Sequence, residues 1–98
     1  MNEDAIAEVG IDGQDRLYVR PATTSFEYIY RSAMEIHWDA DHKRLYGPLP
    51  KEWSYIQWFN QILAATADEY GIRLKLDPTT VWSNVPDDLR TKICVAGE

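Results

Sequence analysis

The segment His37-Trp38-Asp39-Ala40-Asp41-His42 contains residue types that bind metal ions. In an extended chain, successive side chains alternate, so His37, Asp39 and Asp41 would project from one face. Imidazole and carboxylate groups together hold divalent cations and activate bound water, which would be the chemistry of a metal-dependent hydrolase using these three residues and His42. The alternative is a polar hairpin tip whose aspartates accept hydrogen bonds from turn amides. We favour this alternative and predict no metal or other cofactor.

Aromatic residues form a second candidate site. Trp53, Tyr55 and Trp58 fall in a segment, residues 51–70, whose apolar residues repeat every three or four positions, as in a helix. Their positions spread around the helix axis, so we expect some rings to face away from a single inner sheet. Large rigid rings are frequent at binding hot spots, so the pattern predicts a contact surface made of Trp53, Tyr55, Trp58 and Trp82. The alternative is that the helix lies between two core layers, one on each side, which together bury every ring.

Carboxylates are concentrated near the start of the chain. The net charge is −6, from 16 acids and 10 bases, which argues against a phosphate-binding footprint and therefore against nucleic acid as a partner. No base precedes Arg16, whereas five acids do, namely Glu3, Asp4, Glu8, Asp12 and Asp15. Such a strip would steer a basic partner, as in an inhibitor or immunity-type protein that covers a basic active site. Alternatively, it is a solvated strand edge that charge keeps from aggregating.

Several classes of protein are excluded by composition. An apolar content of 45% with 12% aromatic residues is too high for a disordered chain. No apolar run approaches the ~20 residues of a membrane span, so no membrane association is expected. The acidic start lacks the bases of a signal peptide, and the single cysteine, Cys94, cannot form an internal disulfide. We therefore expect a cytoplasmic protein.

The predicted elements form one domain, residues 1–98, of the α+β class. Residues 5–11 and 17–20 alternate as the strands of a hairpin around Asp12-Gly13. The capping-box spacing of Thr24 and Glu27 favours a helix over 24–33, although the aromatic content there also suits a strand. The remaining elements are strands over 34–39, 43–47 and 72–76, a long helix over 51–70 that Gly71 ends, and a final helix from Pro86 to Ala96. The order β-β-α-β-β-α-β-α predicts an antiparallel or mixed sheet packed on the long central helix.

Two segments carry a family resemblance. KEWSYIQWFNQILAATADEYG (51–71) and VWSNVPDDLRTKI (81–93) resemble the small orphan proteins encoded on bacterial integron gene cassettes. The resemblance implies a bacterial, mobile genetic context and a compact α+β fold that is often oligomeric. It implies no catalytic residues.

Taken together, the sequence predicts a binding module rather than an enzyme. It would self-associate, most simply as a dimer, or capture a protein partner or small apolar ligand through the aromatic residues of helix 51–70. The alternatives are the inhibitor that uses its N-terminal acids and the hydrolase at the histidine–aspartate segment.

Overall fold

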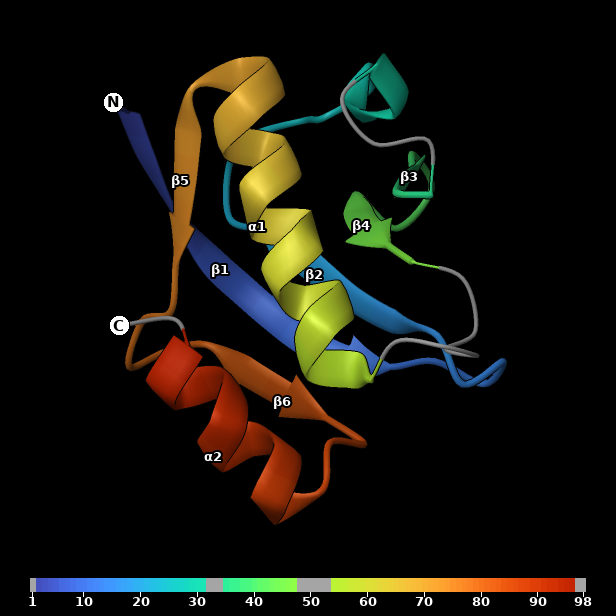
Figure 1. The fold of residues 1–98 in the computed structure, drawn as a ribbon, viewed down its shortest axis with the longest axis vertical. Coiled ribbons are helices and arrows are strands. Elements are labelled where there is room, and N and C mark those ends of the chain that lie inside the picture. The colour runs from blue at the N-terminus through green and yellow to red at the C-terminus, as the bar shows by residue number, and fades with distance from the viewer. Residues whose placement is uncertain (1, 32–34, 48–53, 97–98) are drawn as a thin grey trace.

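The computed structural model describes residues 2–31, 35–47 and 54–96. The fold is α+β, as predicted, with a mixed sheet and two α-helices (Figure 1). In chain order the elements are β1 (Asn2–Ile11), β2 (Leu17–Pro21), the 3-10 turn η1 (Ile29–Arg31), β3 (His37–Asp39), β4 (Arg44–Tyr46), α1 (Tyr55–Tyr70), β5 (Ile72–Lys75), β6 (Val81–Ser83) and α2 (Asp87–Ala96). Within the described ranges, no helix is long and apolar enough to cross a membrane.

Strand β1 is the centre of the sheet. On one edge it pairs with β2 in an antiparallel hairpin, and the order continues outward through β4 to β3. Its other edge is divided between two parallel strands (Figure 1). Residues 2–5 pair with β5, and residues 8–10 pair with β6. The ten-residue length of β1 allows both strands to share one edge.

A β-bulge between Ile6 and Glu8 shifts the alternation of β1. Ile6 and Val9 are both buried in the core although they are three residues apart, which a regular period of two does not allow. The shift turns Glu8 to the opposite face of the sheet, where it meets Tyr18 and Arg20 of β2.

Helix α1 packs its apolar stripe on the sheet and lies across β1 and β2 (Figure 1). Its buried residues are Trp58, Phe59, Ile62, Ala65 and Thr66. The helix begins after Ser54, which forms a capping box with Gln57. It ends at Gly71, whose φ of 65° is the left-handed conformation that favours glycine. The predicted long helix and its stop are therefore confirmed over the described part of 51–70.

The helix predicted over 24–33 is wrong. Of its described residues, 24–28 are irregular and only η1 follows. Thr24 does not form the predicted capping box with Glu27, because the carboxylate of Asp4 accepts the backbone N–H of Thr24 at 2.9 Å. Phe26 is fully buried, edge-on to Tyr70 with ring centroids 4.8 Å apart. The hydroxyl of Tyr70 then accepts the backbone N–H of Tyr28 at 2.8 Å, so tertiary contacts replace the local helical bonds.

The predicted strands over 34–39, 43–47 and 72–76 are shorter in the structure. They correspond to β3, β4 and β5, and residue 34 lies outside the described residues. One strand, β6, was not predicted at all, because its three residues are too few to show a periodic pattern. The final helix begins at Asp87, one residue after the predicted Pro86.

Thr80 joins the two strands that share the edge of β1. Its side chain is 8% exposed, and its hydroxyl donates to the carbonyl of Ile6 at 2.7 Å. The same oxygen accepts the backbone N–H of Asp77 at 2.9 Å. The carbonyl of Ile6 lies between the parts of β1 that pair with β5 and with β6. Thr80 therefore replaces the missing strand–strand hydrogen bond at this break.

The face of the sheet opposite α1 is covered by its own long side chains. The guanidinium of Arg44 lies 4.0 Å above the ring of Tyr18, and that of Arg16 lies 4.3 Å above the ring of Tyr46. Tyr18 is only 5% exposed. It lies so close over Gly10 that a Cβ there would overlap the phenol ring. These cation–π contacts form a coat of rings and guanidinium groups over the strands.

Glu8 links three strands on that covered face. Its carboxylate accepts hydrogen bonds from Tyr18 of β2, at 2.9 Å, and from Ser83 of β6, and the Nε of Arg20 lies 3.4 Å away. Partial burial raises the pKa of Glu8, but these hydrogen bonds together outweigh burial and bring the pKa below its ordinary value. The folded state therefore favours the ionised carboxylate.

Replacing Thr80 with valine keeps the shape of the side chain but removes both hydrogen bonds. The buried carbonyl of Ile6 and amide of Asp77 would lose their partner, so we expect Thr80→Val to lower the free energy of unfolding by about 1–3 kcal/mol. Urea denaturation followed by tryptophan fluorescence measures this change. The exposed loop residue Ser25 is the control, and Ser25→Ala should change stability by no more than about 0.5 kcal/mol. Equal effects of the two substitutions would contradict the role given to Thr80.

The Glu8 network predicts a specific acid dependence. Because the pKa of Glu8 is lower in the folded than in the unfolded state, stability from this group is present above pH 4.5 and is lost as the pH falls through the lowered value. Glu8→Gln should be less stable at pH 7 and should lose less stability than wild type between about pH 5 and pH 3. Denaturation at each pH tests this, with the exposed Glu27→Gln expected to follow wild type. Parallel pH curves for wild type and Glu8→Gln would contradict the assignment.

Candidate functional site

Two neighbouring hollows open around the start of α2, and they hold two of the aromatic residues singled out in the sequence. The first, about 260 Å³, is lined by Ser54, Tyr55, Ile56, Pro86, Asp88, Leu89 and Lys92. The second, about 350 Å³, is lined by Trp82, Asn84, Val85, Pro86, Asp87 and Arg90. Pro86 lines both hollows. We call the two hollows together the Tyr55–Trp82 surface.

Tyr55 is held in place by the first hairpin. It is the first residue of α1, and its hydroxyl donates to the backbone carbonyl of Asp15 at 2.9 Å. Asp15 presents that carbonyl from a left-handed turn, with φ of 62°. Burial, together with the negative charges of Asp15 and Asp12, raises the pKa of Tyr55. The phenol therefore stays neutral and keeps its hydrogen bond, and the half-buried residue lines the first hollow.

Trp82 is the central residue of β6 and is half-buried. The guanidinium of Arg90, from α2, lies 5.0 Å from the centre of its ring. Asn84 turns the chain toward α2 with φ of 59°, and its side-chain amide donates to the carbonyl of Ile11 at 3.4 Å. The strand, the turn and the helix thus fix the indole between the core and the second hollow.

The charges on this surface balance. Asp87 and Asp88 occupy the first turn of α2, where the helix dipole favours acids, and Arg90 and Lys92 follow one turn later. Within the part of the chain that the structure describes, none of these four residues forms a salt bridge. The surface is therefore locally neutral on a protein whose net charge is −6.

The structure does not bring the four predicted aromatic residues together. Trp58 is 7% exposed, in the core of its own chain, and its ring packs on Gly47 so closely that a Cβ there would lie 2.9 Å from Cε3. In this conformation its indole is not accessible to a partner. Trp53 lies outside the described residues. Tyr55 and Trp82 therefore line the surface without Trp58.

Pro86 and two residues of α2, which were not predicted as site residues, complete the surface. Pro86, Arg90 and Lys92 line the hollows, whereas the sequence predicted only a final helix in this segment. The available signal was the run Pro86-Asp87-Asp88, which marks a helix start directly after the aromatic Trp82.

Most of the N-terminal acids form ion pairs or hydrogen bonds within their own chain. Glu3 pairs with Lys75 at 2.6 Å, and this hydrogen bond lowers the pKa of Glu3. Asp12 pairs with Arg16 at 2.8 Å. Asp4 and Glu8 accept the hydrogen bonds described above. Of the five acids, only Asp15 has an exposed carboxylate that makes no such contact in the described chain, so the geometry lends little support to the inhibitor alternative.

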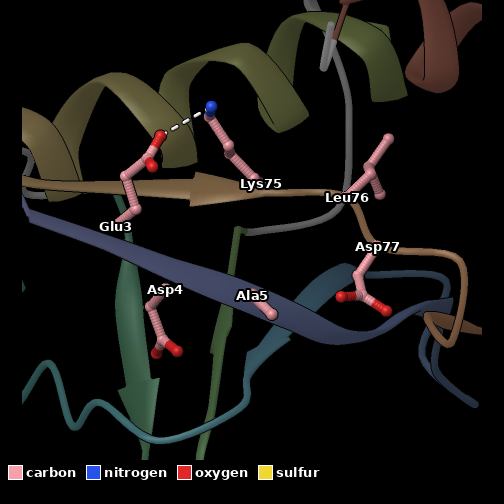
Figure 2. A pocket seen from close by; sticks show the side chains of 6 residues that line it. All are labelled: Glu3, Asp4, Ala5, Lys75, Leu76 and Asp77. Atoms are coloured by element: carbon pink, nitrogen blue, oxygen red, sulfur yellow. Dashed lines mark ion pairs between the residues drawn. The ribbon is translucent and has the colours of Figure 1, made fainter.

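A third hollow, about 260 Å³, lies beside this strip and is lined by Glu3, Asp4, Ala5, Lys75, Leu76 and Asp77. Figure 2 shows Glu3 and Lys75 pointing toward each other, with Asp4 and Asp77 directed away from that pair. The carboxylate of Asp77 accepts the amide of Thr79 at 2.7 Å. The polar side chains that line this third hollow are therefore engaged within the chain, and they do not converge on the hollow.

The histidine–aspartate segment forms a hairpin tip between β3 and β4. Asp39 accepts the backbone N–H groups of Asp41 and His42 at 3.1 and 3.2 Å, and its other oxygen lies 2.8 Å from Nδ1 of His42. His37 stacks on Tyr46, with ring centroids 5.2 Å apart. Among the residues described, no group of three or more histidine, cysteine, aspartate or glutamate side chains is arranged to hold a metal ion.

Comparisons with known proteins give the family. The sequence model of Integron Cassette Protein Hfx_Cass5 matches residues 4–80. A solved Integron Cassette Protein Hfx_Cass5, from the mobile metagenome of North West Arm Sewage Outfall, is 45% identical, with 99% of this chain and 97% of that chain covered and a TM-score of 0.51. No curated protein matches the chain. The chain therefore belongs to the Hfx_Cass5 family of integron cassette proteins, in agreement with the resemblance noted in its two aromatic segments.

Proposed function

We propose that this protein is a binding module that contacts a protein partner through the Tyr55–Trp82 surface, without catalysis. The observation that supports the proposal most directly is the composition of that surface. Tryptophan, tyrosine and arginine are the residues that most often dominate binding energy at protein interfaces. Here Trp82, Tyr55 and Arg90 surround two hollows at one end of the molecule.

The size and lining of the hollows favour a protein over a small apolar ligand. Pockets for small molecules are typically about 300–1,000 Å³ and mostly apolar. These hollows are at or near the lower limit, and charged residues, Asp87 and Arg90 or Asp88 and Lys92, line each of them. Two neighbouring hollows that share Pro86 suit the side chains of a folded partner.

The proposal extends to the setting in which the protein acts. It places the protein in the bacterial cytoplasm, where the half-buried Cys94 would stay reduced. It assigns no cofactor and no nucleic acid or membrane as ligand, because the net charge of −6 opposes both phosphate surfaces.

Site-specific photocrosslinking in bacteria tests the proposal. Replacing Arg90 or Lys92 with p-benzoylphenylalanine places a reactive group in the second or the first hollow, and the exposed Tyr28 provides a control position outside the surface. We expect a defined covalent adduct from position 90 or 92 and none from position 28. Adding Trp82→Ala with Tyr55→Ala should reduce the adduct at least about tenfold, since hot-spot truncations cost that much or more.

Two outcomes contradict the proposal. One is the absence of any protein adduct from both positions 90 and 92, and the other is an equal adduct from position 28. Far-UV circular dichroism of each variant confirms that the fold is kept. The mass of the adduct identifies the partner, whether a second copy or another protein.

A further inference from the structure

We infer that Ser83 and Glu8 are positioning residues for the Tyr55–Trp82 surface. The hydrogen bond between them fixes Trp82, although neither residue lines either hollow in the described chain. The inference rests on the proposed function and deepens it, because it identifies what holds the rings of that surface in place before a partner arrives.

Strand β6 is short, and polar side chains anchor it on both sides of Trp82. The strand has three residues, and among the described strands it pairs with β1 alone. Val81 is 52% exposed, so its side chain adds little apolar burial. Before Trp82, the hydroxyl of Thr80 donates to the backbone of β1, and after it, the hydroxyl of Ser83 donates to Glu8. The position of the indole therefore depends on both anchors.

Glu8 gives Ser83 a fixed point of attachment. The carboxylate of Glu8 also accepts a hydrogen bond from Tyr18 at 2.9 Å, and Nε of Arg20 lies 3.4 Å from it. Tyr18 is itself only 5% exposed, beneath the guanidinium of Arg44. A hydrogen bond to an ionised carboxylate is roughly twice as strong as one between neutral groups. Ser83 is thereby tied firmly to the hairpin of β1 and β2.

Ser83 and Trp82 project to opposite faces of the sheet. Trp82 pairs with Val9, which is fully buried, whereas Ser83 pairs with Gly10 and meets Glu8 on the face opposite α1. A partner seated in the hollows therefore contacts Trp82 and not the Ser83–Glu8 pair. An effect of this pair on binding must pass through the position of the indole.

The second ring of the surface depends on the same hairpin. The hydroxyl of Tyr55 donates to the carbonyl of Asp15, in the turn between β1 and β2. Asp12 closes that turn, because its carbonyl accepts the N–H of Asp15 and its carboxylate accepts the N–H of Arg16, each at 3.0 Å. One hairpin thus sets the positions of both rings. The free protein presents them already ordered, which removes part of the entropic cost of binding.

Fluorine NMR of protein labelled with 5-fluorotryptophan tests the position of Trp82 without any partner. In Ser83→Ala, we expect the Trp82 resonance, assigned with Trp82→Phe, to move toward its position in the unfolded chain, while that of the buried Trp58 stays in place. Ser83→Thr keeps a hydroxyl and should leave the Trp82 resonance at its wild-type position. The matched control is Ser25→Ala, the same change at an exposed loop residue, which should not move the resonance.

Photocrosslinking from position 90 or 92 measures the effect on binding. At matched expression, Ser83→Ala should lower the yield of the adduct at least about threefold, because the ring must then be ordered on binding. Ser83→Thr and Ser25→Ala should give the wild-type yield. Glu8→Gln keeps the shape of the side chain but removes its charge, and it should act in the same direction as Ser83→Ala. Should Ser83→Ala fail to fold by circular dichroism, Glu8→Gln decides both measurements.

Three results would overturn the inference and leave the proposed function intact. They are a Trp82 resonance that Ser83→Ala does not move, a Ser83→Thr variant that behaves like Ser83→Ala, and an adduct whose yield Ser83→Ala does not lower. Absence of any adduct from the wild-type chain would instead end the proposed function, and the inference with it.

Discussion

The architecture depends on one edge of β1 serving two strands. A single long strand accepts β5 along its first half and β6 along its second, and the hydroxyl of Thr80 supplies the bond that neither strand can make at the break. Because β6 is fixed there, the short turn through Asn84 leaves α2 beside the start of α1. The Tyr55–Trp82 surface exists because these two helix starts meet.

The sequence could predict elements whose pattern repeats over many residues. Helix α1 shows four turns of apolar periodicity between a capping serine and Gly71, and it forms nearly as expected. Helical spacing around the segment 24–33 would allow the i, i+4 ion pairs Glu27–Arg31 and Arg31–Glu35, each worth only a few tenths of a kcal/mol. Burying Phe26 contributes about 2 kcal/mol or more and decides against them. Neither that aromatic contact with Tyr70 nor the three-residue β6 has a signal in the local sequence.

The candidate site was likewise only partly predictable from the sequence. Tyr55 and Trp82 could be named from residue type alone, but which rings the core would bury depends on how far the apolar stripe of α1 spreads, and Trp58 lies within it. Pro86, Arg90 and Lys92 gain their importance only from the place of α2 against α1. The family model ends at residue 80, before β6 and α2, whereas the solved family member covers 99% of this chain.

The coat over the opposite face of the sheet has a consequence for assembly. A chain that is to stack into fibres needs two adhesive surfaces that face different ways. Here Tyr18 lies flat on Gly10 beneath Arg44, and Arg16 covers Tyr46. These side chains of the same chain therefore cover the face of the sheet opposite α1. The covered face therefore leaves the sheet without one of the two surfaces that such stacking requires.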